Sequence, residues 1–383
     1  CRIRSAAAEG RDLALATHAL VSGNHHDRTG GQSLAHPVAL DLENADHPAR
    51  DLLEPDAGAE RIAIAEQFLA SRELTPPWHK GFTPPREFVS DMLIKGNYKT
   101  EAFCLKLNHF QEPGASLLCM VMRLTAPEPG AENFREQPAQ NERISSITTT
   151  HAGVMAWLTP CVLAMALPLP PGHLPQDLAC DIKQEMETTL DISISMGAAP
   201  FPWMNFTRQE IFYHSIKALD HSSFHIPGTI IAPPNAITFN IIGDRRYQSG
   251  LFETAMEEYH LGLLLDPGDF NLLNSLGVCN SVLNRFEQAL EQFEKALEII
   301  PDDAMALYNA GLVCNLMEDL EKGGRYLTRA SNLNNSLFEI ELTAGILFAK
   351  TDDTATALEH LEKAASLSPG AGLPRALIGD ICL

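Results

Sequence analysis

The sequence predicts two folded parts of different class, an α/β domain followed by an all-α array of helical repeats. Between residues 75 and 231, short apolar runs of strand length alternate with longer segments of helical periodicity, an order typical of an α/β sandwich. From residue 236 onward, one pattern of small and large residues returns every 34 residues, which is typical of stacked helix pairs. A length of 383 residues agrees with two domains rather than one.

The composition indicates a globular protein that does not bind polyanions. Hydrophobic residues make up 45% of the chain and charged residues 20%, which excludes a disordered chain. The formal net charge of −21 argues against nucleic acid and anionic membrane surfaces, because both need clustered Lys and Arg. The eight cysteines form no C-x-x-C pair, which indicates reduced thiols. We therefore expect a bacterial-type cytoplasmic protein without a nucleic-acid partner or an inserted membrane segment.

The N-terminal segment divides into two parts of different periodicity. Residues 1–56 show no sustained pattern, and we expect an irregular or linker segment there. Residues 57–74 predict one amphipathic helix, because apolar side chains recur at helical spacing. These side chains are Ile62, Ile64, Ala65, Phe68 and Leu69. The helix leads into the α/β domain, to which we assign residues 57–235.

Five segments of the front domain carry the α/β prediction. Residues 103–107 alternate apolar and polar side chains and predict a strand. Residues 162–167 are fully apolar, and residues 190–198 predict a further strand. Between these two strands, residues 174–189 predict an amphipathic helix, and residues 207–222 predict the next one.

Glycines mark the 34-residue period of the C-terminal part. They are Gly243, Gly277, Gly311, Gly345 and Gly379. Twelve residues after the first four glycines lie Ala255, Ala289, Gly323 and Ala357, and sixteen residues after them lie Tyr259, Phe293, Leu327 and Leu361. Two antiparallel helices approach closely only where side chains are small, so each glycine predicts a crossing that a neighbouring large residue fills. Pro267, Pro301 and Pro369 end three of the units.

This pattern resembles the tetratricopeptide repeat family over residues 236–383, as about four and a half repeats. The resemblance implies a superhelix that binds another protein, because the first helix of each repeat lines a concave groove for extended peptides. The residues that it places in the groove are Asn240, Asp244, Tyr247, Asn271, Asn274, Val278, Met305, Tyr308, Leu312 and Asn315. The asparagines would hydrogen-bond a peptide main chain, or they are solvated surface; the sequence leaves both open. The basic clamp for acidic C-terminal tails is absent, so an EEVD-type tail is not the expected ligand.

The front domain resembles the GGDEF nucleotide-cyclase family in the order and spacing of its segments. Residues 103–111 (FCLKLNHFQ) are similar to the first strand of that family, and residues 192–197 (ISISMG) to a later strand. Residues 157–164 (WLTPCVLA) occupy the place of the hairpin motif R-L-G-G-D-E-F-A. The segment between residues 112 and 150 matches the family poorly, and it should carry the first major helix.

The residues at the motif positions lack the chemistry of a cyclase. Phosphoryl transfer needs carboxylates to hold metal ions, and Cys161 and Val162 stand where the motif turn would supply one. Thr159 and Pro160 replace the glycines that let the backbone approach a nucleotide, and Leu163 completes the altered motif. On the first strand, Lys106 and Asn108 replace the carboxylates in the same way. We therefore expect no catalytic residue, no metal and no cofactor.

Two functions remain at this stage. The first is a non-catalytic scaffold in bacterial signalling, with the repeat groove as its working surface and the front domain in a regulatory or dimerising role. The second is a GGDEF-type nucleotide cyclase or a GTP-binding sensor with an atypical site. Formation of a product from GTP in the presence of Mg²⁺ would favour the cyclase, whereas a GTP-binding sensor would bind the nucleotide without turnover.

Overall fold

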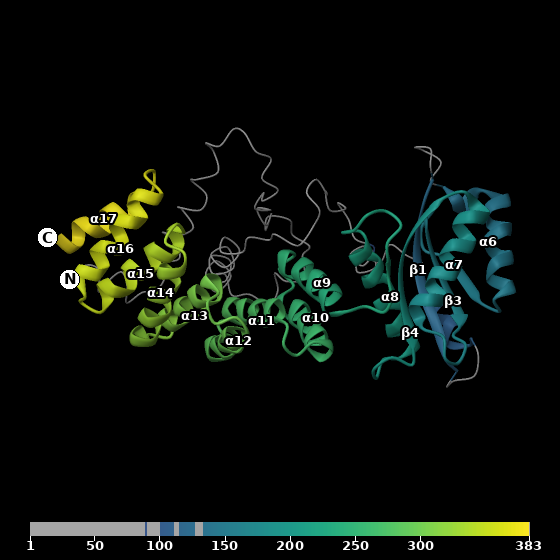
Figure 1. Ribbon diagram of the computed structural model, residues 1–383, viewed down its shortest axis with the longest axis horizontal. Coiled ribbons are helices and arrows are strands. Elements are labelled where there is room, and N and C mark those ends of the chain that lie inside the picture. The colour runs from purple at the N-terminus through teal and green to yellow at the C-terminus, as the bar shows by residue number, and fades with distance from the viewer. Residues whose placement is uncertain (1–88, 90–99, 111–114, 127–132, 383) are drawn as a thin grey trace. The chain divides into compact units, whose positions relative to one another are not determined.

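The computed structural model describes residues 89, 100–110, 115–126 and 133–382. The expected irregular segment 1–56 and the predicted helix over residues 57–74 both lie outside the described residues. The chain divides into two compact units, and the division falls between Ile242 and Gly243. Figure 1 shows a strand-containing unit and a unit made of helices.

The first unit is built on a five-stranded sheet with the order β2-β3-β1-β4-β5. The strands are β1 (Leu117–Thr125), β2 (Val154–Trp157), β3 (Val162–Pro168), β4 (Ser193–Phe201) and β5 (Ile230–Ile231). Strand β1 lies at the centre and runs antiparallel to both β3 and β4, while β5 adds in parallel to β4. Strand β1 is apolar along almost its whole length because helices cover both faces of the sheet.

Alternate residues of β1 point into two separate cores. The helices of this unit are α5 (Thr100–Asn108), α6 (Pro138–Thr150), α7 (Pro175–Leu190) and α8 (Arg208–Ser222). Leu118 and Met120 pack with residues of α6 and α7, including Ile182. Cys119 packs with residues of α5 and α8, including Phe212. The period of two along the strand therefore divides its side chains between two helical layers.

Most elements predicted for this unit are confirmed. The predicted strands at 162–167 and 190–198 correspond to β3 and β4, and the predicted helices at 174–189 and 207–222 correspond to α7 and α8. Helix α6 lies within residues 112–150, where the first major helix was expected. Thr207 begins α8 with a reciprocal cap, because its hydroxyl accepts from the Glu210 amide and the Glu210 carboxylate accepts from the Thr207 amide.

The strand predicted at residues 103–107 is wrong, because this segment lies in helix α5. Phe103 and Leu107 are fully buried and lie four residues apart, which is also the spacing of one helical face. The Phe103 ring packs 4.9 Å from that of Phe212 on α8, whereas Leu105 is 60% exposed. Lys106 is therefore not on a strand; its ammonium donates to the carbonyl of Met155 at the sheet edge. The first strand of the sheet is β1, whose only charged residue is Arg123.

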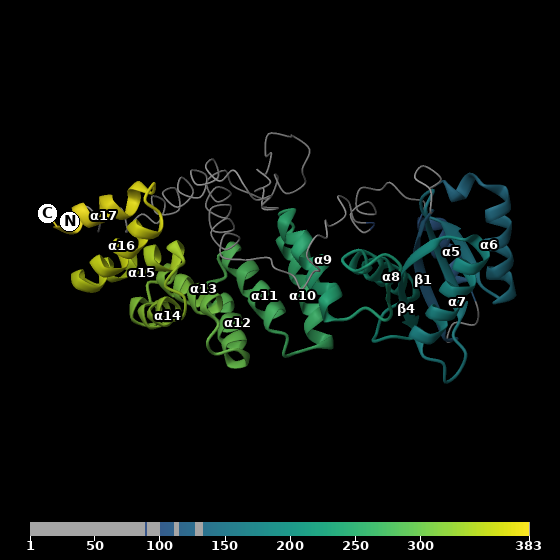
Figure 2. The same cartoon turned by 45° about the horizontal axis from the view of Figure 1, so that its top comes forward.

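The second unit consists of helices that pack in sequential pairs. The first helices of the pairs are α9 (Ala236–Gln248), α11 (Phe270–Val282), α13 (Ala304–Leu316), α15 (Phe338–Lys350) and α17 (Gly372–Cys382). The second helices are α10 (Phe252–Leu265), α12 (Phe286–Ile299), α14 (Leu320–Leu333) and α16 (Thr354–Leu367). Figure 2 shows the same pairs from α11 to α16 stacked along the chain. The division between the units falls inside α9.

The predicted crossings are confirmed at four glycines. A Cβ atom added to Gly243 would lie 2.3 Å from the Tyr259 ring, and one on Gly277 would lie 2.5 Å from the Phe293 ring. At Gly311 and Gly345 the corresponding distances to Leu327 and Leu361 are both 2.7 Å. Ala255, Ala289 and Ala357 of the second helices are fully buried. The fifth glycine differs, because no described atom lies within 4 Å of a Cβ built on Gly379.

A second feature with the same period ends each first helix. Gly250, Asn284, Glu318 and Asp352 all have positive φ, between 57° and 74°, and they are spaced by 34 residues. The left-handed conformation reverses the chain between the two helices of a repeat. Asp319 and Asp353 then begin their second helices by accepting a backbone N–H three residues on. The turn therefore recurs in geometry although its residue type changes.

Candidate protein-binding surface

The structure places the ten predicted groove residues on three first helices, with unequal exposure. Asn240, Asp244 and Tyr247 lie on α9, Asn271, Asn274 and Val278 on α11, and Met305, Tyr308, Leu312 and Asn315 on α13. Only Asn271 is exposed. Tyr247, Val278, Tyr308, Leu312 and Asn315 are at most 3% exposed, and the remaining four are half-buried. Val278, Tyr308 and Leu312, which are apolar or aromatic members of the predicted groove, are thus buried side chains in this structure.

Two hydrogen bonds join adjacent first helices through these residues. The Asn309 amide on α13 donates to Oδ1 of Asn274 on α11 at 3.1 Å. The Lys350 ammonium on α15 donates to Oδ1 of Asn315 on α13 at 2.9 Å. Burial lowers the pKa of Lys350, and the Glu318 carboxylate offsets part of this effect. The groove positions of α11, α13 and α15 therefore lie side by side.

Asn309 and Lys350 were not predicted from the sequence. The positions equivalent to Asn309 in the neighbouring repeats are occupied by Ser275 and Thr343. The positions equivalent to Lys350 in the two preceding repeats are occupied by Val282 and Leu316. A search for recurring residue types therefore cannot find them. The available signal for Asn309 is that it lies about one helical turn from the predicted groove residues Met305 and Leu312 on α13. Lys350 lies on α15, where no groove residue was predicted.

Two amide atoms of the predicted groove are buried without a hydrogen-bond partner among the described residues. They are Oδ1 of Asn240 and Nδ2 of Asn315, one acceptor and one donor. Buried polar atoms in folded proteins are nearly always paired, so each unpaired atom calls for an explanation. The two atoms belong to different units, because Asn240 precedes the division after Ile242 and Asn315 follows it.

Asp244 has a structural contact inside its own repeat. Its carboxylate accepts a hydrogen bond of 2.8 Å from the hydroxyl of Tyr259. Tyr259 is the residue whose ring fills the space beside Gly243. Asp244 therefore orients the side chain that closes the first helix pair.

In the front unit, the altered motif forms the tight connection between β2 and β3. The hydroxyl of Thr159 accepts hydrogen bonds from the backbone N–H groups of Cys161 and Val162, at 3.1 and 2.9 Å. The carbonyl of Cys161 accepts from the Leu124 N–H at the end of β1. Val162 and Leu163 are buried in β3, and Pro160 has no N–H to offer. The amides of this turn are thus engaged by the protein itself.

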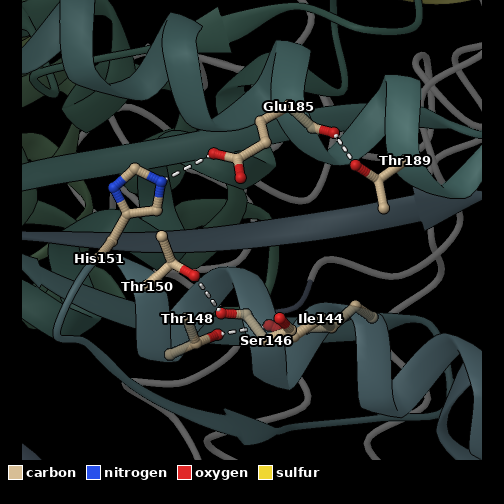
Figure 3. A network of polar contacts seen from close by, with 7 residues as sticks. All are labelled: Ile144, Ser146, Thr148, Thr150, His151, Glu185 and Thr189. Carbon is tan, nitrogen blue, oxygen red and sulfur yellow. Dashed lines mark hydrogen bonds and ion pairs between the residues drawn. The ribbon is translucent and has the colours of Figure 1, made fainter.

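The outer surface of α6 and α7 carries a small polar network (Figure 3). His151 Nε2 lies 2.7 Å from a carboxylate oxygen of Glu185. The hydroxyls of Thr148 and Thr189 donate to backbone carbonyls four residues earlier in their helices. Glu185 also borders an open hollow of about 370 Å³, with Asp181, Gln184, Thr188 and Thr189. The local hydroxyl donors are used within the helices, and the hollow is bordered by carboxylates and side-chain amides.

The described residues contain neither a metal-binding cluster nor a helix able to span a membrane. In that part of the chain, no group of three or more His, Cys, Asp or Glu side chains is arranged to hold a metal ion. No helix of the same residues has the length and apolar character needed to cross a membrane.

The comparison with protein families matches one repeat directly. The tetratricopeptide repeat family matches residues 270–303, which contain α11, α12 and the turn that follows. The matched segment is as long as the 34-residue period of the sequence, and it includes the crossing at Gly277. The C-terminal part of the chain is a tetratricopeptide repeat superhelix. A search of curated proteins found no match.

Solved structures similar to parts of this chain include MamA, YrrB and the first TPR of Spaghetti (RPAP3). MamA is 25% identical, with a TM-score of 0.36 over 37% of this chain and 82% of MamA. YrrB, described as a TPR protein with an unusual peptide-binding site, is 23% identical, with a TM-score of 0.36 over 38% of this chain and 76% of YrrB. The first TPR of Spaghetti (RPAP3), in a structure with a bound HSP90 peptide, is 18% identical. Its TM-score is 0.30, and the match covers 30% of this chain and 93% of the Spaghetti chain.

Proposed function

We propose that this protein is a non-catalytic scaffold whose tetratricopeptide array binds an extended segment of another protein. The front domain is, in this proposal, a degenerate GGDEF-like domain with a regulatory or dimerising role in bacterial cytoplasmic signalling. The binding surface consists of the first helices α9, α11 and α13 and extends to Lys350 on α15. The front domain contributes no catalytic residue, metal ion or cofactor.

The observation that carries the binding proposal is the pair of unpaired amide atoms on the first helices. Oδ1 of Asn240 and Nδ2 of Asn315 are buried and have no hydrogen-bond partner among the described residues. The apolar side chains of Val278, Tyr308 and Leu312 occur between them in the chain. An extended peptide combines main-chain hydrogen-bonding groups with alternating apolar side chains, and it therefore fits this mixture.

The proposal of an inactive front domain rests on the residues of β1 and of the β2–β3 turn. Strand β1 carries Arg123 and no carboxylate, and the Arg123 guanidinium donates to the Ser223 hydroxyl. The turn holds its own amides through Thr159, and Cys161 occupies the position of an acidic ligand. A triphosphate with its metal ions needs carboxylates that converge on one point. Neither segment supplies them.

The experiment is a peptide selection against the full-length chain. A library of displayed peptides is selected on immobilised protein, and the affinities of enriched peptides are measured by fluorescence anisotropy. We expect peptides that bind the wild type and lose about tenfold in affinity or more in the double variant Asn240→Ala, Asn315→Ala, a change of roughly 1.4 kcal/mol. Asn332→Ala, on an exposed position of α14, is the matched control and should leave affinity unchanged. Selection of no peptide, or equal loss in the control, would contradict the proposal.

A further inference from the structure

A hydrogen bond between two neighbouring first helices fixes how one amide of the predicted groove is turned. The ammonium of Lys350, the last residue of α15, donates to Oδ1 of Asn315 on α13 at 2.9 Å. An ammonium can donate a hydrogen bond but cannot accept one, so the oxygen of this amide must face Lys350. Nδ2 of Asn315 therefore lies on the side of the amide that is turned away from the lysine.

The amide nitrogen of Asn315 is a donor without an acceptor among the described residues. Asn315 is 2% exposed, and its Nδ2 atom is buried. A buried donor that lacks an acceptor costs free energy, and a freely turning amide could reduce that cost by changing places with its oxygen. Lys350 prevents this turn, because the turned amide would bring Nδ2 against the ammonium. The contact therefore keeps an unpaired donor in place on a first helix of the array.

The position of Lys350 also has a cost. The side chain is half-buried, and burial lowers the pKa of its ammonium, although the Glu318 carboxylate offsets part of this effect. A lysine that served only to complement the C-terminal end of α15 could extend its ammonium into solvent. The contact with Asn315 instead holds the ammonium against a neighbouring helix. This arrangement indicates a role for Lys350 that depends on Asn315.

We propose that Lys350 is a positioning residue of the binding surface, which holds the Asn315 amide so that Nδ2 donates to a main-chain carbonyl oxygen of the bound segment. This inference rests on the proposed function of the array. It names the atom through which Asn315 acts and the residue that orients this atom. Lys350 acts through Asn315 and not through a contact of its own with the partner.

The surroundings of the amide favour a neutral acceptor over a carboxylate. Asn315 lies in the last turn of α13 and Lys350 in the last turn of α15, and the C-terminal ends of helices carry a partial negative charge. The Glu318 carboxylate adds a negative charge near Lys350. Helices α11 and α13 contain no charged residue that would compensate a further anion. A peptide carbonyl accepts a hydrogen bond without adding charge, so it fits this site.

The experiment measures the affinity of selected peptides for the full-length chain by fluorescence anisotropy. We expect Lys350→Met to weaken binding about tenfold, because the released amide can turn and withdraw its donor. Asn315→Asp should weaken binding as much, since a carboxylate keeps an oxygen for Lys350 but has no N–H. Lys363→Met, on α16 and paired with Glu359, is the matched control and should leave affinity unchanged.

A double variant distinguishes positioning from a merely structural role of the lysine. In the Asn315→Ala background, Lys350→Met should cause no further loss of affinity, because the amide on which the lysine acts is gone. A further loss in that background would overturn the inference, as would wild-type affinity in Lys350→Met or in Asn315→Asp. Peptides in which every Asp and Glu is replaced by Asn or Gln should keep their affinity; a loss would identify a carboxylate as the acceptor and overturn the neutral one.

A measurement without peptide separates this inference from the proposed function. In NMR spectra of chain labelled with ¹⁵N-asparagine, the side-chain amide signals of Asn315 are identified by their loss in Asn315→Ala. These signals should shift in Lys350→Met and stay in place in Lys363→Met. Unchanged signals in Lys350→Met would overturn the positioning role, whether or not any peptide binds.

The two proposals therefore fail in different ways. If peptides bind through Asn240 and Asn315 while Lys350→Met binds them as well as the wild type does, the positioning role is wrong and the binding function stands. If the Asn315 signals shift in Lys350→Met but the wild type binds no peptide, the binding function is wrong and the orientation of the amide by Lys350 stands.

Discussion

Close helix packing is achieved in different ways in the two units. In the front unit, Gly197 of β4 lies against the backbone of α8, and an added Cβ would come 2.0 Å from the Leu219 nitrogen and 2.2 Å from the Ser215 carbonyl oxygen. In the array, a Cβ on Gly277 would meet the side chain of Phe293, at 2.5 Å. Backbone atoms of a packed helix cannot move alone, whereas a ring can shift within its rotamer. A methyl group added against backbone atoms should therefore cause more strain than one added against a movable side chain.

The largest effect is expected for Gly197→Ala. The methyl group overlaps the backbone of α8, so the sheet and the helix must separate, and we expect a loss of about 4 kcal/mol or more in unfolding free energy. All three tryptophans precede the array in sequence, so urea unfolding followed by tryptophan fluorescence reports on this part of the chain. A smaller loss of unfolding free energy in Gly197→Ala than in Gly277→Ala would contradict the difference between the two units.

Gly277→Ala should have a smaller effect, roughly 1–3 kcal/mol, because the Phe293 ring can give way in part. Urea unfolding monitored by circular dichroism at 222 nm reports on the helical array. The matched control is Gly379→Ala on α17, where no described atom lies within 4 Å of the added methyl. We expect that control to be neutral or stabilising by up to about 1 kcal/mol, because alanine favours the helix over glycine. Equal losses at both positions would contradict the crossing model.

Acid should destabilise the front unit, because it buries histidines in a neutral form. Burial lowers the pKa of His214 to about 3, among the rings of Trp203, Phe206 and Phe239, and nearby Lys217 adds to the effect. Burial, together with the neighbouring His225, lowers the pKa of His221 to about 4. The unfolded chain binds these protons near pH 6.5, before the folded chain does, so stability is complete above that pH and declines below it toward pH 4 and 3.

The decline should be roughly 2 kcal/mol per histidine between pH 7 and pH 5, measured by urea unfolding with tryptophan fluorescence. His214→Phe keeps an aromatic side chain and should remove about half of the slope. An unchanged slope in His214→Phe would show that the decline has another origin.

The smallest expected effect is on nucleotide chemistry. The wild-type chain and the variant Val162→Glu should both leave GTP unconverted in the presence of Mg²⁺, because one carboxylate on β3 has no second one on β1. Chromatography of the nucleotides after prolonged incubation is the measurement, with an active cyclase as the positive control. Formation of a cyclic dinucleotide by the wild type would favour the alternative function.

The array was predictable because each structural role occurs several times. The pairing of Gly243 with Tyr259 and of Gly277 with Phe293 appears in the sequence as a constant separation of sixteen residues. Each repeat is an independent observation of the same packing rule, so chance resemblance is averaged out. The turn at Asn284 and Glu318 repeats in conformation but not in residue type, and for that reason the sequence did not reveal it.

The front unit offers each element only once, and local ambiguity therefore remained. Over residues 103–107, the apolar spacing fits a strand and a helix equally well, and packing of Phe103 on Phe212 decides for the helix. The central strand at residues 117–125 went unpredicted, because the resemblance placed the first strand at residues 103–111 and the first major helix after it. A hairpin was expected around residues 157–164 from their resemblance to the motif segment, and β2 and β3 lie on either side of residues 158–161.

The sequence by itself determined the class of both parts, the 34-residue frame, the four glycine crossings and the positions of the first helices. These properties depend on spacing along one chain, which the sequence records directly. Only the tertiary structure decided that Tyr308 and Leu312 are buried. It also decided the hydrogen bonds from Asn309 to Asn274 and from Lys350 to Asn315. The hydrogen bond from Lys106 to the carbonyl of Met155 on the edge strand β2 is a third such feature. The burial of a side chain and its hydrogen-bond partners depend on contacts between segments that are tens of residues apart in the sequence. No local sequence pattern specifies these contacts.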